Sequence, residues 1–221
     1  DNHFCSFSNS VSIGSDLIFN VQINQDTVTL YENEVEFNIA SQSTEDPVAN
    51  TWYGYWAYDN TDIDYIQAPE YEWIELDPSY GGGDGTEYKL DDDDHVNVDL
   101  SFNFQYFGRT YDEITISSNG WVSFELCDID YFYNYTIPMA MGPGALLAPF
   151  WDDLEVINND SIRVYTKHDE ENGRFIIQWS RALNGFDEVT EETFAIHLYD
   201  QTAMPTESAD GVIEFHYLEI A

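Results

Sequence analysis

The chain has 221 residues, with 43 Asp and Glu against 6 Lys and Arg, and its formal net charge is −37. This charge repels nucleic acid and anionic membranes, so we expect neither as a partner, and salt or bound cations must moderate the self-repulsion. The length suits one large all-β domain, alone or with a fragment of another. The sequence contains no run of about 18 apolar residues, which is the length that a membrane-spanning helix requires.

Apolar and polar side chains alternate with a period of two along most of the chain, which is typical of strands with one buried face. Turn-forming stretches such as "QDT", "GGGDG" and "EENG" separate the alternating segments. Short strands at this spacing predict an all-β fold, either a β-sandwich or a jelly roll. The predicted strands cover residues 16–24, 27–39, 97–107, 113–126, 161–168, 174–183, 193–200 and 211–220.

A polar segment with a proline, "SQSTEDPVAN" at residues 41–50, interrupts the alternation and predicts a domain boundary. We assign residues 1–45 to a partial immunoglobulin-like segment or a hairpin extension, and residues 46–221 to the main sandwich domain. The first segment is too short for the about seven strands of a complete sandwich. Its strand edges must be covered by the main domain, by another domain of a longer chain, or by another copy. The chain begins without Met, so we expect a processed chain or a piece of a larger protein.

The chain contains two cysteines, Cys5 and Cys127. An even number permits one disulfide, which would close a loop of more than a hundred residues and stabilise the fold by roughly 4–5 kcal/mol. Two buried thiols would suit the apolar neighbours equally well. Both alternatives stay open at this stage.

The sequence lacks the motifs that mark common enzyme sites. There is no His-Glu-x-x-His and no Gly-x-Ser-x-Gly, and the glycine-rich stretch "GGGDG" is not followed by the Lys and Ser or Thr of a phosphate loop. The five histidines are scattered, and His197 and His216 are interpreted as surface residues or as strand residues with satisfied hydrogen bonds. We therefore expect a protein that is not an enzyme.

Three acidic clusters have a density that loops use to bind cations. They occur in "YDNTDIDY", "LDDDDH" and "FWDDL". Calcium takes six to eight oxygen ligands from carboxylates, carbonyls and water, so we expect a structural Ca²⁺ site, although a solvated acidic loop is the alternative for each cluster. The twelve-residue EF-hand pattern is not satisfied, because its sixth position, counted from the first aspartate, is not Gly. The candidate metal ligands are Asp59, Asp62, Asp64, Asp92, Asp93, Asp94, Asp152 and Asp153.

Aromatic residues are numerous, with 16 Tyr, 14 Phe and 6 Trp, and several of them gather in polar surroundings. Exposed flat rings can bind sugars or form cohesive protein interfaces, whereas strands also use aromatic residues for ordinary packing. A carbohydrate-binding surface is therefore one alternative for the stretch "TWYGYWAY". Its candidate residues are Trp52, Tyr53, Tyr55 and Trp56.

Residues 52–221 resemble a β-rich module that recurs in large secreted bacterial proteins, which often carry gingipain- or subtilisin-type peptidase domains elsewhere. The middle of this region is similar to the nidogen-like extracellular domain, which has three short motifs in a fixed order. Here they are Phe107-Gly108, Ser118-Asn119-Gly120 and Ala148 to Asp152. The resemblance implies an extracellular or cell-surface location and a non-catalytic role.

The stretch "ALLAPFW" is expected to be a buried strand that ends at Trp151, which places Asp152 and Asp153 where the chain leaves it. We expect a structural role for these carboxylates rather than a catalytic one. The function that this sequence predicts is a structural or adhesive extracellular module, stabilised by cations and able to self-associate into a fibre. A carbohydrate-binding accessory module of a secreted bacterial enzyme is the alternative.

Overall fold

The protein is described here by a computed structural model, in which the chain divides into two compact units. The first comprises Asp1–Asn50 and Tyr55–Ala68, and the second comprises Thr51–Gly54 and Pro69–Ala221. The predicted all-β fold is confirmed, since one 3₁₀ turn is the sole helical segment in the part of the chain that is described. The structure describes residues 16–25, 28–38, 46–49, 53–138, 142–156, 161–187 and 189–220.

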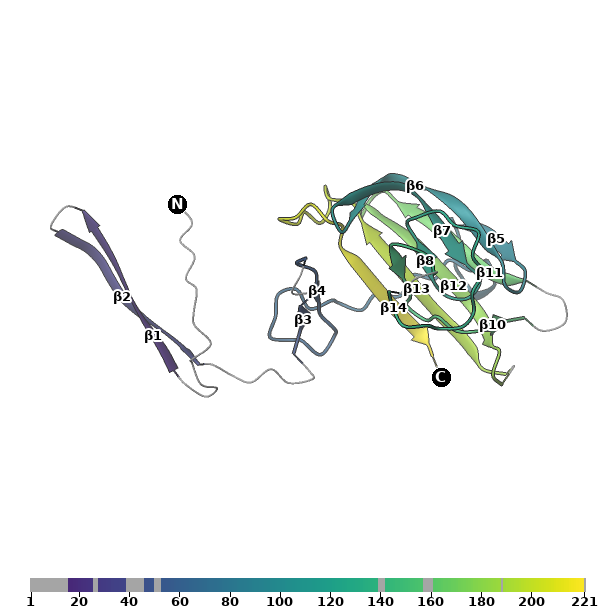
Figure 1. The fold of residues 1–221 in the computed structure, drawn as a ribbon, viewed down its shortest axis with the longest axis horizontal. Helices are drawn as coiled ribbons and strands as arrows, with labels where there is room; N and C mark the ends of the chain where they lie inside the picture. The colour runs from purple at the N-terminus through teal and green to yellow at the C-terminus, as the bar shows by residue number, and fades with distance from the viewer. Residues whose placement is uncertain are drawn as a thin grey trace. The chain divides into compact units, whose positions relative to one another are not determined.

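The first unit contains two small antiparallel sheets. Strands β1 (Asp16–Gln25) and β2 (Val28–Asn38) form a hairpin, and β3 (Val48–Ala49) pairs with β4 (Trp56–Ala57) (Figure 1). These two strands agree with the strands predicted for residues 16–24 and 27–39. Four large apolar side chains of the hairpin are exposed, namely Ile18, Val21, Ile23 and Tyr31.

The second unit is built on two antiparallel sheets. The larger sheet has the strand order β14-β13-β12-β11-β5, and β10 pairs with the far end of β12. The smaller sheet has the order β6-β7-β8-β9. The larger sheet consists of β5 (Thr86–Leu90), β10 (Leu154–Glu155), β11 (Ile162–Asp169), β12 (Arg174–Asn184), β13 (Glu191–Tyr199) and β14 (Ile213–Glu219), and the smaller one of β6 (His95–Tyr106), β7 (Arg109–Ser117), β8 (Val122–Ser123) and β9 (Leu146–Leu147).

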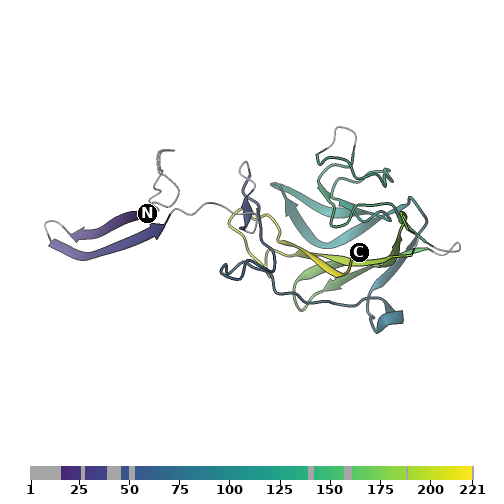
Figure 2. The same ribbon diagram turned by 90° about the horizontal axis from the view of Figure 1, so that it is seen from below.

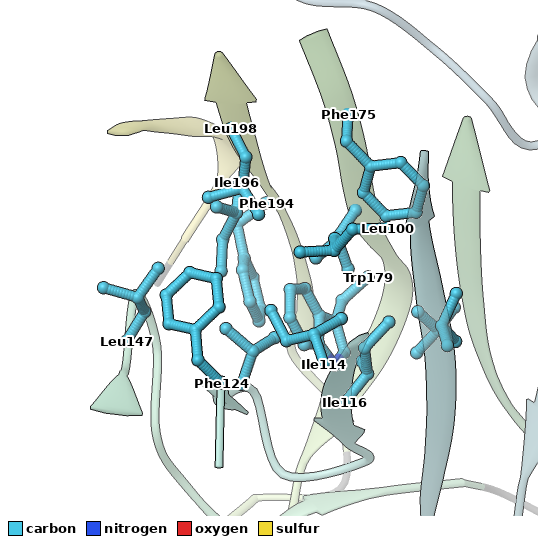
Figure 3. Packing of buried hydrophobic residues seen from close by; sticks show 14 of the residues in the cluster. Leu100, Ile114, Ile116, Phe124, Leu147, Phe175, Trp179, Phe194, Ile196 and Leu198 are labelled. Carbon is cyan, nitrogen blue, oxygen red and sulfur yellow. The ribbon is translucent and has the colours of Figure 1, made fainter. Parts of the chain in front are cut away.

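The two sheets face each other as the layers of a sandwich, with β6 and β7 over the larger sheet (Figure 2). Apolar side chains from both sheets fill the space between them, because alternate residues of each strand point inward. Figure 3 shows Ile114 of β7 and Phe124, which directly follows β8, packed with Trp179 and Phe194 from the larger sheet. The rings of Trp179 and Phe194 stack with their centroids 5.0 Å apart. This burial of apolar area is the main force that holds the sandwich together.

A two-residue turn joins β6 to β7 at Phe107 and Gly108. Both residues have positive φ, of 48° and 74°, as the tight turn of a right-twisted hairpin requires. The amide of Gly108 donates to a carboxylate oxygen of Asp210 at 2.8 Å. The first of the three motifs is therefore a hairpin turn.

The outer face of the larger sheet is covered by an extended stretch, residues 69–80, which we call the back segment. It ends in the 3₁₀ turn η1 (Pro78–Tyr80). Leu76 of the back segment packs on Tyr165 and Ile176, and its amide donates to the side chain of Gln178 at 2.7 Å. The buried hydroxyl of Ser180 donates to Asp77 at 2.7 Å. Both faces of the inner strands β12 and β13 are thus buried, one by apolar and one by largely polar contacts.

The structure shortens one predicted strand and describes one of the two cysteines. The stretch "ALLAPFW" forms a strand over Leu146–Leu147 and then turns at Pro149 and Phe150, so the predicted strand to Trp151 is too long, although Trp151 is buried. Proline cannot donate to a strand partner, which is consistent with the early end. The predicted disulfide lies partly outside the described residues, because Cys5 is not described. Cys127 is half-buried and has no disulfide partner within the described part.

No helix among the described residues has the length and apolar character that crossing a membrane requires.

Candidate functional site

The structure brings together carboxylates from two of the three predicted acidic clusters. Asp92 and Asp93 lie in the turn between β5 and β6, and Asp153 lies just before β10. One carboxylate oxygen from each lies within 4.8 Å of the others. Since the two clusters are some sixty residues apart in the chain, only the fold makes them neighbours. We call Asp92, Asp93 and Asp153 the acidic corner.

A buried asparagine, Asn119, holds the two halves of the acidic corner together. Its side-chain Nδ2 donates to Oδ1 of Asp93 at 2.9 Å, and its Oδ1 accepts from the amide of Leu154 at 3.1 Å. The side chain is fully buried, so water cannot reach it and its hydrogen bonds must come from the protein. Asn119 belongs to the second motif, Ser118-Asn119-Gly120. Sequence reasoning named this motif but gave no role to the asparagine.

The glycine of the same motif allows the third motif to approach closely. Gly120 has φ +75°, and a Cβ added there would lie 1.8 Å from the carbonyl oxygen of Phe150. Nearby, the indole nitrogens of Trp121 and Trp151 both donate to the carbonyl of Tyr131, at 3.0 and 2.9 Å. These contacts fix the chain immediately before Asp152 and Asp153.

The electrostatics of the acidic corner disfavour three ionised carboxylates in the absence of a cation. Partial desolvation by the neighbouring chain and, to a smaller extent, the charge of Asp93 raise the pKa of Asp92. Burial raises the pKa of Asp153, and the charges of Asp92, Asp93 and Asp152 add to the effect. A bound divalent cation would remove this repulsion.

Two other predicted ligands flank the acidic corner and bind backbone amides instead. Oδ1 of Asp94 accepts from the amide of His95 at 2.8 Å, and Oδ2 accepts from the amide of Asp91 at 3.2 Å. Oδ1 of Asp152 accepts from the amide of Asp153 at 2.9 Å. Neither Asp94 nor Asp152 belongs to the group of converging carboxylates. Their contacts fit the structural role expected for Asp152.

The third predicted cluster, Asp59, Asp62 and Asp64, lies in the first unit. Oδ1 of Asp59 accepts from the amide and the hydroxyl of Thr61, and Oδ2 of Asp62 accepts from the amide of Asp59. Asp64 is exposed. Within the described residues these three carboxylates form no converging group. The first two therefore stabilise a local turn.

The predicted sugar-binding residues do not form one described platform. Trp52 lies outside the described residues. Tyr53 belongs to the second unit and packs on Phe107, with ring centroids 4.8 Å apart, whereas Tyr55 and Trp56 belong to the first unit. Trp56 is exposed and its ring lies beside that of Tyr58.

A second group of potential metal ligands lies on the outer face of the larger sheet and consists of His197, Glu214 and His216. The interpretation of the two histidines as surface residues or satisfied strand residues is wrong. Both are buried, because the neighbouring strand and the back segment surround that face, and Nδ1 of each has no hydrogen-bond partner in the described structure. Burial lowers the pKa of His197 to about 3, with further contributions from His216 and Arg174. One sequence feature could have indicated this group: Glu214 and His216 are two residues apart in one strand, so both side chains leave the same face of the sheet.

The second unit is an all-β sandwich in which Asn119 and Gly120 of the second motif hold neighbouring loops close together. The family model described as NIDO related matches residues 70–220, and the chain belongs to the NIDO-related family. This confirms the coarser part of the resemblance found in the sequence. No curated protein and no solved structure matches the chain.

Proposed function

We propose that the chain is a non-catalytic extracellular structural module whose acidic corner binds Ca²⁺. The observation that carries this proposal is the convergence of Asp92, Asp93 and Asp153 within 4.8 Å from two separate loops. A cation held between these loops would connect β5, β6 and β10 at one end of the sandwich. The NIDO-related family supports the extracellular part of the proposal. The fuller context, a large secreted bacterial protein, is part of the same proposal.

The chemistry of the acidic corner suits calcium better than other common ions. Calcium binds carboxylate, carbonyl and water oxygens in flexible geometry, and all three side chains offer oxygen alone. Two of them are exposed and the third is half-buried, so water can complete the coordination shell. The chain's net charge of −37 raises the local concentration of cations.

Thermal unfolding with Ca²⁺ and with chelator at matched ionic strength tests the proposal. A ligand that binds only the folded state stabilises it by about 2.7 kcal/mol at a free concentration one hundred times Kd. Calcium should therefore raise the melting midpoint of the native chain and of the control Asp112→Asn, which changes an exposed carboxylate on β7. It should have much less effect on Asp93→Asn. Titration with Tb³⁺, a luminescent substitute for calcium, would give the stoichiometry.

Equal midpoints with calcium and with chelator would contradict the proposal, because ionic screening is the same in both. An equal response of Asp93→Asn and Asp112→Asn would place the ion elsewhere. Magnesium at the same concentration provides a further comparison, since it prefers a rigid octahedral shell and loses water reluctantly.

A second candidate function is glycan binding by a row of rings in the first unit. Trp56 and Tyr65 are exposed, and Tyr58 lies between them, with ring centroids 6.4 and 5.9 Å from its two neighbours. Such a row offers apolar faces to sugar rings while nearby carboxylates accept hydroxyl hydrogen bonds. A glycan array with the native chain and with Trp56→Ala tests it. Equal signals from both proteins, or no signal from either, would reject this role.

We propose that the β1–β2 hairpin binds a partner, which is either another domain of a longer protein or a second copy of this chain. It is a sheet of two strands that exposes Ile18, Val21, Ile23 and Tyr31. Two-stranded sheets are marginally stable alone, and unpaired strand edges readily accept another strand. This arrangement favours assembly through added strands.

A further inference from the structure

The buried histidine group on the outer face of the larger sheet is set by the register of two neighbouring strands. β13 and β14 run side by side at one edge of the sheet (Figure 1), and His197 of β13 is directly opposite Glu214 of β14. His216 follows two residues after Glu214, so its side chain leaves the same face. A single sheet face thus presents two imidazoles and one carboxylate.

The distances within this group match those between ligands of one metal ion. Oε2 of Glu214 lies 3.1 Å from Nε2 of His216 and 3.9 Å from Nδ1 of His197. Three ligands at about 2.1 Å from a tetrahedral Zn²⁺ are about 3.4 Å apart, which falls between the two observed values. The ligand atoms of all three residues lie within 4.8 Å of one another. The rings of His197 and His216 stack with their centroids 4.1 Å apart, so rotation of these side chains would aim all three ligand atoms at one ion.

An unpartnered nitrogen gives independent evidence that something is bound there. His197 is 1% exposed and His216 is 4% exposed, and Nδ1 of each lacks a hydrogen-bond partner in the described structure. Burying a polar group without a partner costs free energy, so such groups in a native fold need an explanation. Nδ1 of His197 is the atom that faces Glu214, and a metal ion would give it a partner. Nδ1 of His216 carries the ring proton when Nε2 binds the ion.

The charges around the group also favour a cation. Arg174 is the positive charge nearby, and it is already paired with Asp169 at 2.8 Å and with Glu72 at 3.1 Å. With Glu214, the surroundings hold three carboxylates against one guanidinium. Glu214 is oriented by the hydroxyl of Tyr199, which donates to its Oε2 at 2.7 Å. This contact is of the kind that orients carboxylate ligands in metal sites.

We propose that His197, Glu214 and His216 bind one Zn²⁺ ion, with water as the fourth ligand. The side chain of Glu214 is 18% exposed, which leaves a path for the ion and the water. The bound ion fastens the edge strand β14 to β13. This site is separate from the acidic corner and differs from it in chemistry, because two of its three ligands are imidazole nitrogens, which zinc prefers and calcium does not.

The test uses the native chain without a histidine tag, stripped of metal and then titrated with Zn²⁺ against a chromogenic chelator. Calcium is present in excess throughout, so the acidic corner is already saturated with the ion that suits it. We expect one Zn²⁺ per chain. Co²⁺ should give the visible absorption bands of a low-coordinate nitrogen and oxygen site.

Ligand variants locate the ion. Glu214→Gln and His216→Asn should each weaken Zn²⁺ binding by more than about 100-fold, since loss of contacts beyond the ligands already costs 10- to 100-fold. Tyr199→Phe removes such an outer contact and should weaken binding by about 10-fold. His168→Asn, at an exposed histidine of β11, is the matched control and should bind as the native chain does. His95→Asn tests the other histidine that lies beside carboxylates, near Asp128 and Asp130.

One measurement needs no variant and so does not depend on whether the variants fold. Long-range ¹H–¹⁵N NMR spectra of the native chain report each imidazole nitrogen, and Zn²⁺ should shift the signals of His197 and His216 and leave that of His168 unchanged. Absence of stoichiometric Zn²⁺ binding would overturn the proposal. So would unchanged signals from His197 and His216, or equal affinity in the ligand variants and the His168→Asn control.

Discussion

Asn119 and Asp93 are joined by a hydrogen bond of 2.9 Å that connects the Ser-Asn-Gly motif of the sequence to the acidic corner. The same side chain accepts the amide of Leu154, so one buried amide group holds two loops. Its position explains how acidic segments far apart in the chain come to face each other.

Replacement of Asn119 by Ala should destabilise the fold and weaken calcium binding together. The change leaves the buried amide of Leu154 without its acceptor, and an unsatisfied buried group costs about 1–3 kcal/mol. Urea denaturation measures the loss, and Tb³⁺ titration measures the effect on the acidic corner. Asn97→Ala, at an exposed asparagine whose side chain accepts from Thr115, is the control and should cost less. Equal losses in both variants would contradict the bridging role.

Gly120→Ala should be among the most destabilising single substitutions in the second unit. The residue has φ +75°, and a Cβ would lie 1.8 Å from the carbonyl oxygen of Phe150. Backbone strain together with this overlap should cost about 3 kcal/mol or more. Gly83→Ala is the matched control, because a Cβ there meets nothing within 4 Å. Chemical denaturation of both variants checks the prediction, which fails if their stabilities are equal.

Acid should destabilise the protein through carboxylates at the back segment. Burial alone would raise the pKa of Asp77, but hydrogen bonds from Ser180 and Ser79 and the charge of Arg163 hold it below its ordinary value. Because the folded pKa lies below the unfolded one, this stabilisation is fully present above about pH 4 and is lost as pH falls through the folded value. The free energy of unfolding, measured in urea from neutral pH downward, should therefore fall in this range.

Asp77→Asn should lower stability at neutral pH and make the acid-dependent fall shallower, because the variant has no carboxyl to protonate at this position. Asp112→Asn should leave the slope as it is in the native chain. If the slope for Asp77→Asn equals the native slope, the acid effect comes from other groups. The pKa values of Glu75 and Asp169 are also below their ordinary values, so these two carboxylates would then account for the loss of stability in acid.

Asp153→Asn should have opposite effects with and without calcium. Burial and the charges of Asp92, Asp93 and Asp152 raise the pKa of Asp153, so its ionised form opposes folding when no cation is bound. In chelator the variant should unfold at a higher urea concentration than the native chain. With calcium it should lose the native response. A lower midpoint in chelator would show that the negative charge of Asp153 itself supports the fold.

Assembly through the hairpin should depend on its exposed apolar side chains. Ile18→Ser with Ile23→Ser should reduce self-association in high salt with calcium, where screening weakens the repulsion between highly charged chains. Ile66→Ser, at a still more exposed apolar position of the first unit, is the control. Light scattering measures the mass of each. Monomers in all three proteins under these conditions would remove the second copy as the hairpin's partner and leave another domain.

The sequence determined the class of fold, because strand alternation is a local property that follows from side chains pointing to opposite faces of a strand. The predicted strand 97–107 ran one residue too far, because Phe107 and Gly108 form the turn to β7 with positive φ. The sequence did not determine the length of the strand before Trp151, where the chain turns at Pro149 and Phe150. The strand ends where it does because the turn at Phe150 packs against Gly120, and this contact joins segments that are distant in the sequence.

The tertiary structure alone decided which acidic and histidine residues meet. Eight aspartates had similar local surroundings in the sequence, and three of them converge because Asn119 holds their loops together. His197 and Glu214 face each other because of the register between β13 and β14, in which a shift of one residue would turn every side chain of one strand to the other face. Register is fixed by the packing of the whole sheet, so the sequence around either residue holds no sign of its partner.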